Sequence, residues 1–159
     1  MDYRETARAI KADSTKLGAL SGETRNEALG AIRQALITNK EKIFSANRED
    51  MARAEAEQLA APILGRLKFD EHKLADVTDG IESLVKIPDP ISQTVFRRML
   101  DDGLLLEKVT CPIGVIGVIF ESRPDALVQI SALCIKSGNC AILKGGSEAA
   151  RTNRALFDV

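Results

Sequence analysis

Two polar stretches hold the residues best suited to chemistry, and each directly follows an apolar run. The first is Glu121-Ser122-Arg123-Pro124, and the second is Lys144-Gly145-Gly146-Ser147. The second stretch places a cation and two units of bare backbone just before a predicted helix. Free N–H groups and the positive end of the helix dipole favour an anion at such a place. These residue types predict a site for a phosphate or carboxylate group.

Both stretches also have a plainer interpretation. The guanidinium of Arg123 suits a phosphate or carboxylate through two parallel hydrogen bonds, but it is equally able to form a surface ion pair with Glu121 or Asp125. Lys144 and its glycines could form an ordinary turn with a solvated lysine. Neither stretch has the spacing of a P-loop, and "GVIG" does not match the dinucleotide fingerprint G-x-G-x-x-G.

Cysteine and histidine give little sign of a metal or disulfide. The cysteines are Cys111, Cys134 and Cys140, an odd number without C-x-x-C spacing, and His72 is the one histidine. We therefore expect neither a disulfide framework nor a metal site. Each cysteine has apolar neighbours and is predicted to be a small buried thiol. His72 lies among charged residues and is predicted to be exposed.

The elements that precede these stretches are predicted to be helices, because apolar residues recur every three or four positions through residues 1–90. Thr24 and Glu27 have the spacing of a capping box, and Pro62 and Gly65 mark the start and end of a short helix. We expect the stripes to be packing faces rather than a cofactor site. They consist of Ala7, Ile10, Ser14 and Leu17; Leu29, Ile32 and Leu36; Ile43, Phe44, Asn47 and Met51; and Leu74, Val77, Ile81 and Leu84.

The pattern changes at Val95. Asp102-Gly103 between two strand-like runs predicts a β-hairpin over 95–112. A strand over 113–120, a helix over 125–136 that ends at Gly138, and the strand "CAILK" then predict a βαβ unit with parallel strands. A further helix follows, with Ser147 as its predicted N-cap. The fold class is therefore α/β, with N-terminal helices, a β-hairpin and the start of a Rossmann-like parallel sheet.

This arrangement predicts that the two polar stretches meet. Ligands of open α/β sheets bind at the carboxyl ends of parallel strands, where both stretches lie. The strands are apolar without alternation, so both faces of the sheet are predicted to be covered. Gly114 and Gly117 are interpreted as places where the hairpin or a neighbouring backbone approaches closely, rather than as ligand contacts.

The last predicted helix runs to Val159 without a stop signal, and two parallel strands cannot complete a doubly wound sheet. We therefore expect the chain to be a truncated, N-terminal piece of a longer protein. Its formal charge of -1 leaves no large cationic surface for nucleic acid or anionic lipid. The first residues are charged and lack an apolar core, so neither a signal peptide nor a membrane anchor is expected, and a cytoplasmic location is predicted.

Several motifs of the chain occur together in one known family. They are "IFESRPD", "KSGN" and "LKGGSEA", with further similarity in "RNEAL", "ANREDMARAEA", "IPDP" and "GLLLEKV". By these motifs the chain resembles the gamma-glutamyl phosphate reductase (glutamate-5-semialdehyde dehydrogenase) family of the aldehyde dehydrogenase superfamily. The resemblance implies an aldehyde dehydrogenase-like fold. Residues 1–94 would be the helical part of a cofactor-binding domain, 95–112 an oligomerisation hairpin, and 113–159 the incomplete first βαβα of a Rossmann-like unit.

The resemblance also implies an activity. In proline biosynthesis, NADPH would reduce L-glutamyl 5-phosphate to L-glutamate 5-semialdehyde and release phosphate, through a cysteine thioester. None of the three cysteines matches the family's nucleophile, which is expected beyond Val159, so the 159 residues alone are predicted to be inactive. The full-length protein is expected to be a homo-oligomer. Two alternatives remain open: a non-catalytic assembly or nucleotide-binding module, and a relative that acts on a thioester or free aldehyde.

Site residues follow from the same resemblance. Glu121, Ser122, Lys144, Gly145, Gly146 and Ser147 are assigned to the cofactor. Many NAD-preferring relatives carry a glutamate three places after the lysine. Ser147 occupies that place here, with Glu148 next, which leaves room for a 2′-phosphate and favours NADP(H). Where most aldehyde dehydrogenases have Pro-Trp-Asn, this chain has Glu121-Ser122-Arg123. Arg123 is therefore assigned to the acyl phosphate or the developing oxyanion.

Overall fold

The computed structural model describes residues 3–159 and confirms the α/β fold class. Helices α1 (Tyr3–Ala19), α2 (Gly22–Thr38), α3 (Lys40–Ala56), α4 (Ala61–Leu67) and α5 (Glu71–Lys86) come first. Strands β1 (Thr94–Asp101) and β2 (Leu104–Val109) form a hairpin. The chain continues through β3 (Val115–Ile119), α6 (Pro124–Lys136), β4 (Cys140–Lys144), a 3₁₀ turn η1 (Ser147–Ala149) and α7 (Ala150–Phe157).

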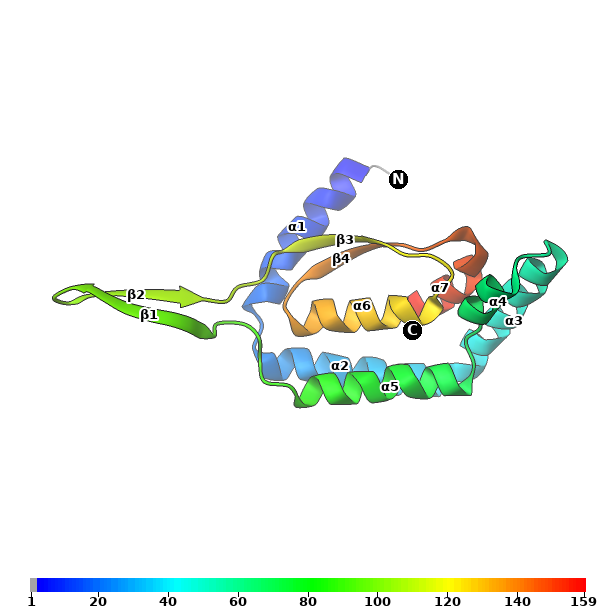
Figure 1. The fold of residues 1–159 in the computed structure, drawn as a ribbon, viewed down its shortest axis with the longest axis horizontal. Helices are drawn as coiled ribbons and strands as arrows, with labels where there is room; N and C mark the ends of the chain where they lie inside the picture. Colours follow the sequence, from blue (N-terminus) through cyan, green and yellow to red (C-terminus); the bar gives the residue numbers. More distant parts are fainter. Residues whose placement is uncertain (1–2) are drawn as a thin grey trace.

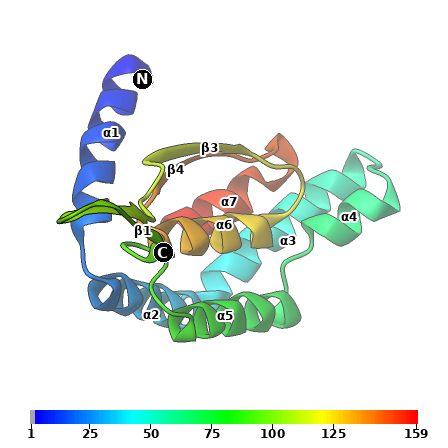
Figure 2. The same cartoon turned by 60° about the vertical axis from the view of Figure 1, so that its left-hand side comes forward.

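The helices and the small sheet form layers, with β3 and β4 above α6 and α7, and with α2 and α5 below (Figure 2). The predicted apolar stripes on α2, α3 and α5 contribute to the core between these layers, as expected from their helical period. The stripe predicted on α1 is not part of this core, and its Ala7 is exposed. The buried members of the core include Leu29, Leu36, Ile43, Leu74, Val77, Ile81, Leu127 and Val128.

Helix α2 begins earlier than the sequence pattern predicts. Ser21 is its N-cap, and its side chain accepts a hydrogen bond from the Thr24 N–H at 3.1 Å. The predicted capping box of Thr24 and Glu27 is therefore wrong, because the serine three residues upstream already satisfies a free N–H of the first turn.

Strands β3 and β4 are parallel and in register from Val115 opposite Cys140 to Ile119 opposite Lys144. Helix α6 lies along one face of this pair (Figure 1), and α1 contacts both strands near one end. Ile119 is 79% exposed and Ile142 is 43% exposed. Within residues 3–159, the prediction of a sheet covered on both faces therefore holds for the α6 face only.

The two strand glycines differ from each other. Gly114 has φ +116°, and the atom nearest to an ideal Cβ there is Lys11 Nζ on α1 at 3.2 Å, a side-chain atom, so the expected approach of the hairpin or of a neighbouring backbone is wrong. Gly117 has open space within 4 Å, so that expectation is wrong for it as well. Gly138 ends α6 as predicted. Its φ of +68° strains any residue with a Cβ, and an ideal Cβ there would lie 2.6 Å from Ile91 Cδ1, so glycine is favoured.

The hairpin stands away from the rest of the molecule (Figure 1). Gly103, with φ +75°, makes its turn after Asp102, and Arg97 pairs with Glu107 across the two strands. Apolar side chains are exposed along both strands. They are Val95, Phe96, Met99, Leu100, Leu104, Leu105, Leu106 and Val109, which we call the hairpin patch.

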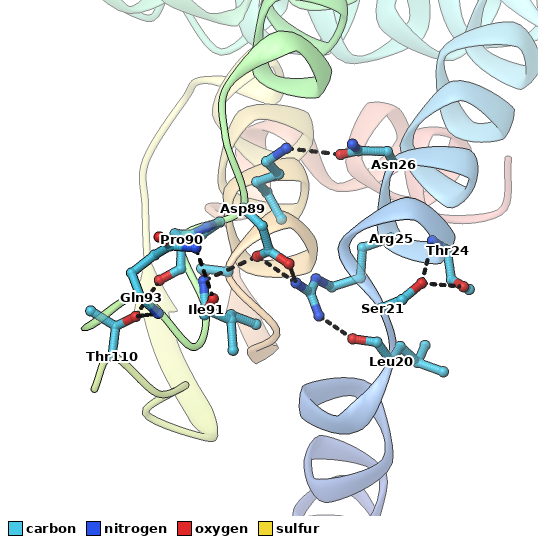
Figure 3. A network of polar contacts seen from close by, with 12 residues as sticks. Leu20, Ser21, Thr24, Arg25, Asn26, Asp89, Pro90, Ile91, Gln93 and Thr110 are labelled. Atoms are coloured by element: carbon cyan, nitrogen blue, oxygen red, sulfur yellow. Dashed lines mark hydrogen bonds and ion pairs between the residues drawn. The ribbon is translucent and has the colours of Figure 1, made fainter. Parts of the chain in front are cut away.

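A polar network that includes the buried Arg25 anchors the base of the hairpin (Figure 3). Arg25, 1% exposed, donates from Nη2 to both carboxylate oxygens of Asp89 at 2.6 and 2.7 Å. Asp89 in turn accepts from the Ile91 N–H at 3.0 Å, and Thr110 Oγ1 donates to the Pro90 carbonyl at 2.7 Å. The segment that enters the hairpin is therefore fixed to α2 at one point and to the end of β2 at another.

Candidate functional site

A cavity of about 440 Å³ opens where β3 and β4 end, and both polar stretches contribute to it. The pairing of the strands continues past β3, since the Phe120 N–H donates to the Lys144 carbonyl at 3.0 Å. The lining residues are Leu59, Ile63, Ile119, Phe120, Glu121, Ser122, Lys144, Gly145, Gly146, Ser147 and Glu148. All six residues assigned to the cofactor thus lie around one cavity.

Ser122 holds the carboxylate of Glu148. It is a buried residue with φ +41°, in the left-handed region that is unfavourable for a residue with a Cβ. Its N–H and its hydroxyl both donate to Glu148 Oε1, at 2.7 and 2.6 Å. These hydrogen bonds, the one from the Ser122 side chain foremost, lower the pKa of Glu148 below its ordinary value. The carboxylate is therefore both charged at neutral pH and tied to the opposite strand tip.

The two glycines make room for the protein's own side chains. An ideal Cβ on Gly145 would overlap with the Asn153 amide, and one on Gly146 would overlap with both carboxylate oxygens of Glu148. The sequence pattern identified this pair as bare backbone but gave no sign of what lies over it.

The turn after the glycines is fixed from α3. Arg53 Nη2 donates to the carbonyls of Ser147 and Glu148 at 2.7 and 3.1 Å. The fully buried carboxylate of Asp50 accepts from the Thr152 N–H and hydroxyl, both at 2.8 Å, and so joins α3 to α7. Ser147 makes no capping hydrogen bond and is the first residue of η1, whose N-cap is Gly146. The prediction of Ser147 as N-cap is wrong.

Lys144 is the cation at the cavity. Its side chain is exposed and forms no ion pair with any of residues 3–159. Glu121 is also exposed at the rim, on the strand tip across from Lys144. An anionic group that entered the cavity would thus meet a lysine whose charge no carboxylate of the described chain neutralises by direct contact.

Arg123 lies beside the cavity rather than in its lining. Its Nη2 is 3.5 Å from Asp125 Oδ2, and its side chain is 54% exposed. Asp125 is buried and is also 3.3 Å from Lys73 Nζ. The structure thus contains the ion pair between Arg123 and Asp125, which was the plainer interpretation of the sequence. The role of Arg123 in substrate binding stays a prediction.

The thiols, the histidine and the acidic residues give no second centre in the described part of the chain. Cys134 is buried and Cys140 is half-buried, and burial raises the pKa of both thiols. Cys111 is exposed, so its predicted burial is wrong. His72 is exposed as predicted, 3.1 Å from Asp76. Residues 3–159 hold no group of His, Cys, Asp and Glu suited to a metal ion, and none of their helices could span a membrane.

No family model matches the chain. It is 57% identical over 159 residues to a gamma-glutamyl phosphate reductase of Ruminiclostridium cellulolyticum, and 54% identical to one of Acetivibrio thermocellus. Each match covers 100% of this chain and 37% of the relative. The chain therefore spans a little over a third of the length of these curated relatives.

Solved structures agree with these matches. Gamma-glutamyl phosphate reductase from Saccharomyces cerevisiae superposes with a TM-score of 0.96 at 40% identity, over 99% of this chain and 40% of that one. The Thermotoga maritima gamma-glutamyl phosphate reductase gives 0.93 at 29% identity, over 97% of this chain and 37% of that one. A probable aldehyde dehydrogenase from Listeria monocytogenes gives 0.66 at 14% identity, over 98% of this chain and 32% of that one, which shows the fold alone.

Proposed function

We propose that this chain, a homologue of the gamma-glutamyl phosphate reductases over its whole length, forms part of the cofactor site of an enzyme of that activity. The enzyme would use NADPH to reduce L-glutamyl 5-phosphate to L-glutamate 5-semialdehyde and phosphate, a step of proline biosynthesis. One observation supports this most: Ser122 and Lys144, from two different strand tips, line a single cavity together with the Gly-Gly turn.

The residues present fit the phosphorylated adenosine end of NADPH. The cavity volume lies in the range of small-molecule sites. Lys144 offers an unpaired cation for a 2′-phosphate, while Leu59, Ile63 and Ile119 give the cavity an apolar wall. Ser147, exposed at the start of η1, places a small neutral side chain where a glutamate would oppose that phosphate.

When bound, NADPH supplies the hydride. The other part of the reaction requires a thiolate that attacks the acyl phosphate, with loss of phosphate as the leaving group and formation of a thioester. We assign that thiolate to none of Cys111, Cys134 and Cys140, because none lines the cavity and burial raises the pKa of the last two. The nucleophile would therefore come from sequence beyond these residues. Arg123 would stabilise the acyl phosphate or the oxyanion.

The domain roles belong to this proposal. Residues 1–94 and 113–159 would build one cofactor-binding domain, since α5 and α6 pack against each other in the common core. The hairpin, residues 95–112, would serve assembly of a homo-oligomer. Its exposed patch supports this role, because large apolar patches on a monomer's surface mark interaction sites.

The test is an assay of the protein as the gene encodes it, with enzymatically generated L-glutamyl 5-phosphate and NADPH. We expect NADPH oxidation that depends on the acyl phosphate and releases phosphate. The same protein should be inactive with a glutamyl or acetyl coenzyme A thioester. Activity with the thioester alone would favour the other class of aldehyde dehydrogenase relative, and NADPH binding without turnover would favour a non-catalytic nucleotide-binding module.

Lys144→Ala tests whether NADPH binds in the cavity during this reaction. Loss of one charge-assisted contact to a phosphate should raise KM for NADPH roughly tenfold, with a smaller change in kcat. Lys11→Ala, which removes an exposed lysine from α1 outside the cavity, is the matched control. Equal KM values for wild type and Lys144→Ala would contradict the assignment.

A further inference from the structure

We propose that Ser122 is a positioning residue that sets coenzyme selectivity: by holding the Glu148 carboxylate over Gly146, it leaves Lys144 free for a 2′-phosphate. This inference rests on the proposed function, since it assumes that the cavity takes the adenosine end of a nicotinamide coenzyme. Ser122 would act through Glu148 and need not contact the coenzyme itself.

Two donors on one oxygen show that the carboxylate is held rather than merely near. The N–H and hydroxyl of Ser122 converge on Glu148 Oε1, at 2.7 and 2.6 Å. The N–H can point there because Ser122 adopts φ +41°, a strained conformation for a serine. A strained backbone conformation persists only where the surrounding structure maintains it. Here the maintained conformation of Ser122 forms a binding site for the Glu148 carboxylate.

Gly146 and Arg53 complete this binding site for the Glu148 carboxylate. A Cβ on Gly146 would overlap with both carboxylate oxygens, so the carboxylate lies directly over that glycine. Arg53 fixes the backbone that carries Glu148 by donating to the carbonyls of residues 147 and 148. The glutamate is thus restrained at both its main chain and its side-chain tip.

The position of this carboxylate decides which coenzyme the cavity favours. A carboxylate beside Lys144 would neutralise it, repel a 2′-phosphate and accept a hydrogen bond from a 2′-hydroxyl, which is how acidic residues select NAD. In the structure Glu148 is hydrogen-bonded to Ser122 and forms no ion pair with Lys144, although both residues line the cavity. Glu121, the other carboxylate of the lining, is unchanged in every comparison below.

The experiment measures ligand affinity, not turnover, on the protein as the gene encodes it. Adenosine 2′,5′-bisphosphate and adenosine 5′-monophosphate differ by the 2′-phosphate alone, and calorimetry gives the Kd of each. In Ser122→Ala the hydroxyl is lost and only the backbone N–H still donates to Glu148, so the carboxylate is held less firmly and can swing toward Lys144 more often. We expect the preference for the bisphosphate to fall roughly fivefold, the size of one partly exposed charge interaction.

A second variant combines Ser122→Ala with Glu148→Gln and is measured with the same two nucleotides. Its neutral amide cannot neutralise Lys144, so the preference for the bisphosphate should return to within about twofold of wild type. Ser122→Gly loses the same hydroxyl but relieves the positive φ, and it takes the place of Ser122→Ala if that variant does not fold.

Three results would overturn the inference: an unchanged preference in Ser122→Ala, a preference that stays low in the double variant, or wild-type protein that binds neither nucleotide. The last would contradict the proposed function as well. Wild-type protein that binds both nucleotides but reduces no acyl phosphate would contradict the proposed function alone, and the ratio of the two Kd values would still decide the role of Ser122.

Discussion

The hydrogen bonds from Ser122 to Glu148 make the stability of the fold depend on pH. The folded-state pKa of Glu148 is lowered, so its contribution is complete above the ordinary glutamate value of about 4.3 and is lost as the pH falls through the lowered value. We expect Ser122→Ala to cost about 1.5–3 kcal/mol of unfolding free energy at pH 7, the size of a hydrogen bond to a charged group.

Urea unfolding of wild type and Ser122→Ala, at intervals from pH 7 to pH 3, measures this. The difference between the two proteins should shrink in acid, because protonated Glu148 accepts these bonds less strongly. A difference that stays constant down to pH 3 would show that the serine acts through its backbone conformation and not through the carboxylate.

Arg123 is the residue for which the structure and the resemblance offer different partners. It is 3.5 Å from Asp125 and half exposed, yet it follows the strand tip that carries Ser122. If it meets the acyl phosphate or the oxyanion, Arg123→Ala should lower kcat/KM for L-glutamyl 5-phosphate well beyond twofold in the protein as the gene encodes it. Arg123→Lys keeps the charge and should recover part of the loss. A change below about twofold would leave the ion pair with Asp125 as its whole role.

These residues show how far sequence reasoning reaches into the site. The residue types, together with the rule that ligands bind at the carboxyl ends of parallel strands, predicted that Ser122, Lys144 and the glycine pair lie together. In the structure they line one cavity. The contact between Ser122 and Glu148 could not be predicted, because it depends on a positive φ at a serine and on a side chain that folds back over Gly146. Neither leaves a periodic or compositional signal.

Among the elements, helices were the most predictable because their apolar stripes are long and regular. Leu74, Val77 and Ile81 were assigned to one packing face and are buried together. Helix ends were less predictable: α2 is capped by Ser21, and the helix after the glycines begins as a 3₁₀ turn in which Ser147 caps nothing. Such ends are decided by one or two hydrogen bonds, and several polar residues within a turn can supply them.

The hairpin was recognised from Asp102-Gly103, but its sequence could not say that both faces would be exposed in this chain. The hairpin patch leads to a prediction about assembly. Met99 lies opposite Leu105 and is 61% exposed, so Met99→Glu should place a charge in any interface that the patch forms. We expect the variant to shift the protein encoded by the gene toward smaller species in sedimentation velocity.

Ile37→Glu is the matched control for Met99→Glu, since it charges an exposed apolar position on α2, outside the hairpin. It should leave the sedimentation pattern of wild type unchanged. An identical oligomeric state for wild type and Met99→Glu would mean that the hairpin patch is not part of an interface between copies.

The molecule as a whole exposes more of its sheet than its strand sequences suggest. Ile119 and Ile142 are exposed on the face opposite α6, although the strands are apolar without alternation. Uniformly apolar parallel strands are typical of sheets covered on both sides. The relatives are nearly three times as long as this chain, and under the proposed function we expect sequence like theirs to cover this face and to complete the cofactor site.

This inference predicts how the 159 residues behave alone. Binding to the native state raises the free energy of unfolding by RT ln(1 + [L]/Kd), so NADPH shifts Tm only when its concentration exceeds Kd. With the described residues supplying the adenosine side of the site alone, we expect millimolar NADPH to leave Tm unchanged and turnover to be absent. The protein encoded by the complete gene, assayed in parallel by differential scanning fluorimetry, should show a clear rise. A comparable rise for the 159 residues would mean that the cavity between β3 and β4 is already a complete nucleotide site.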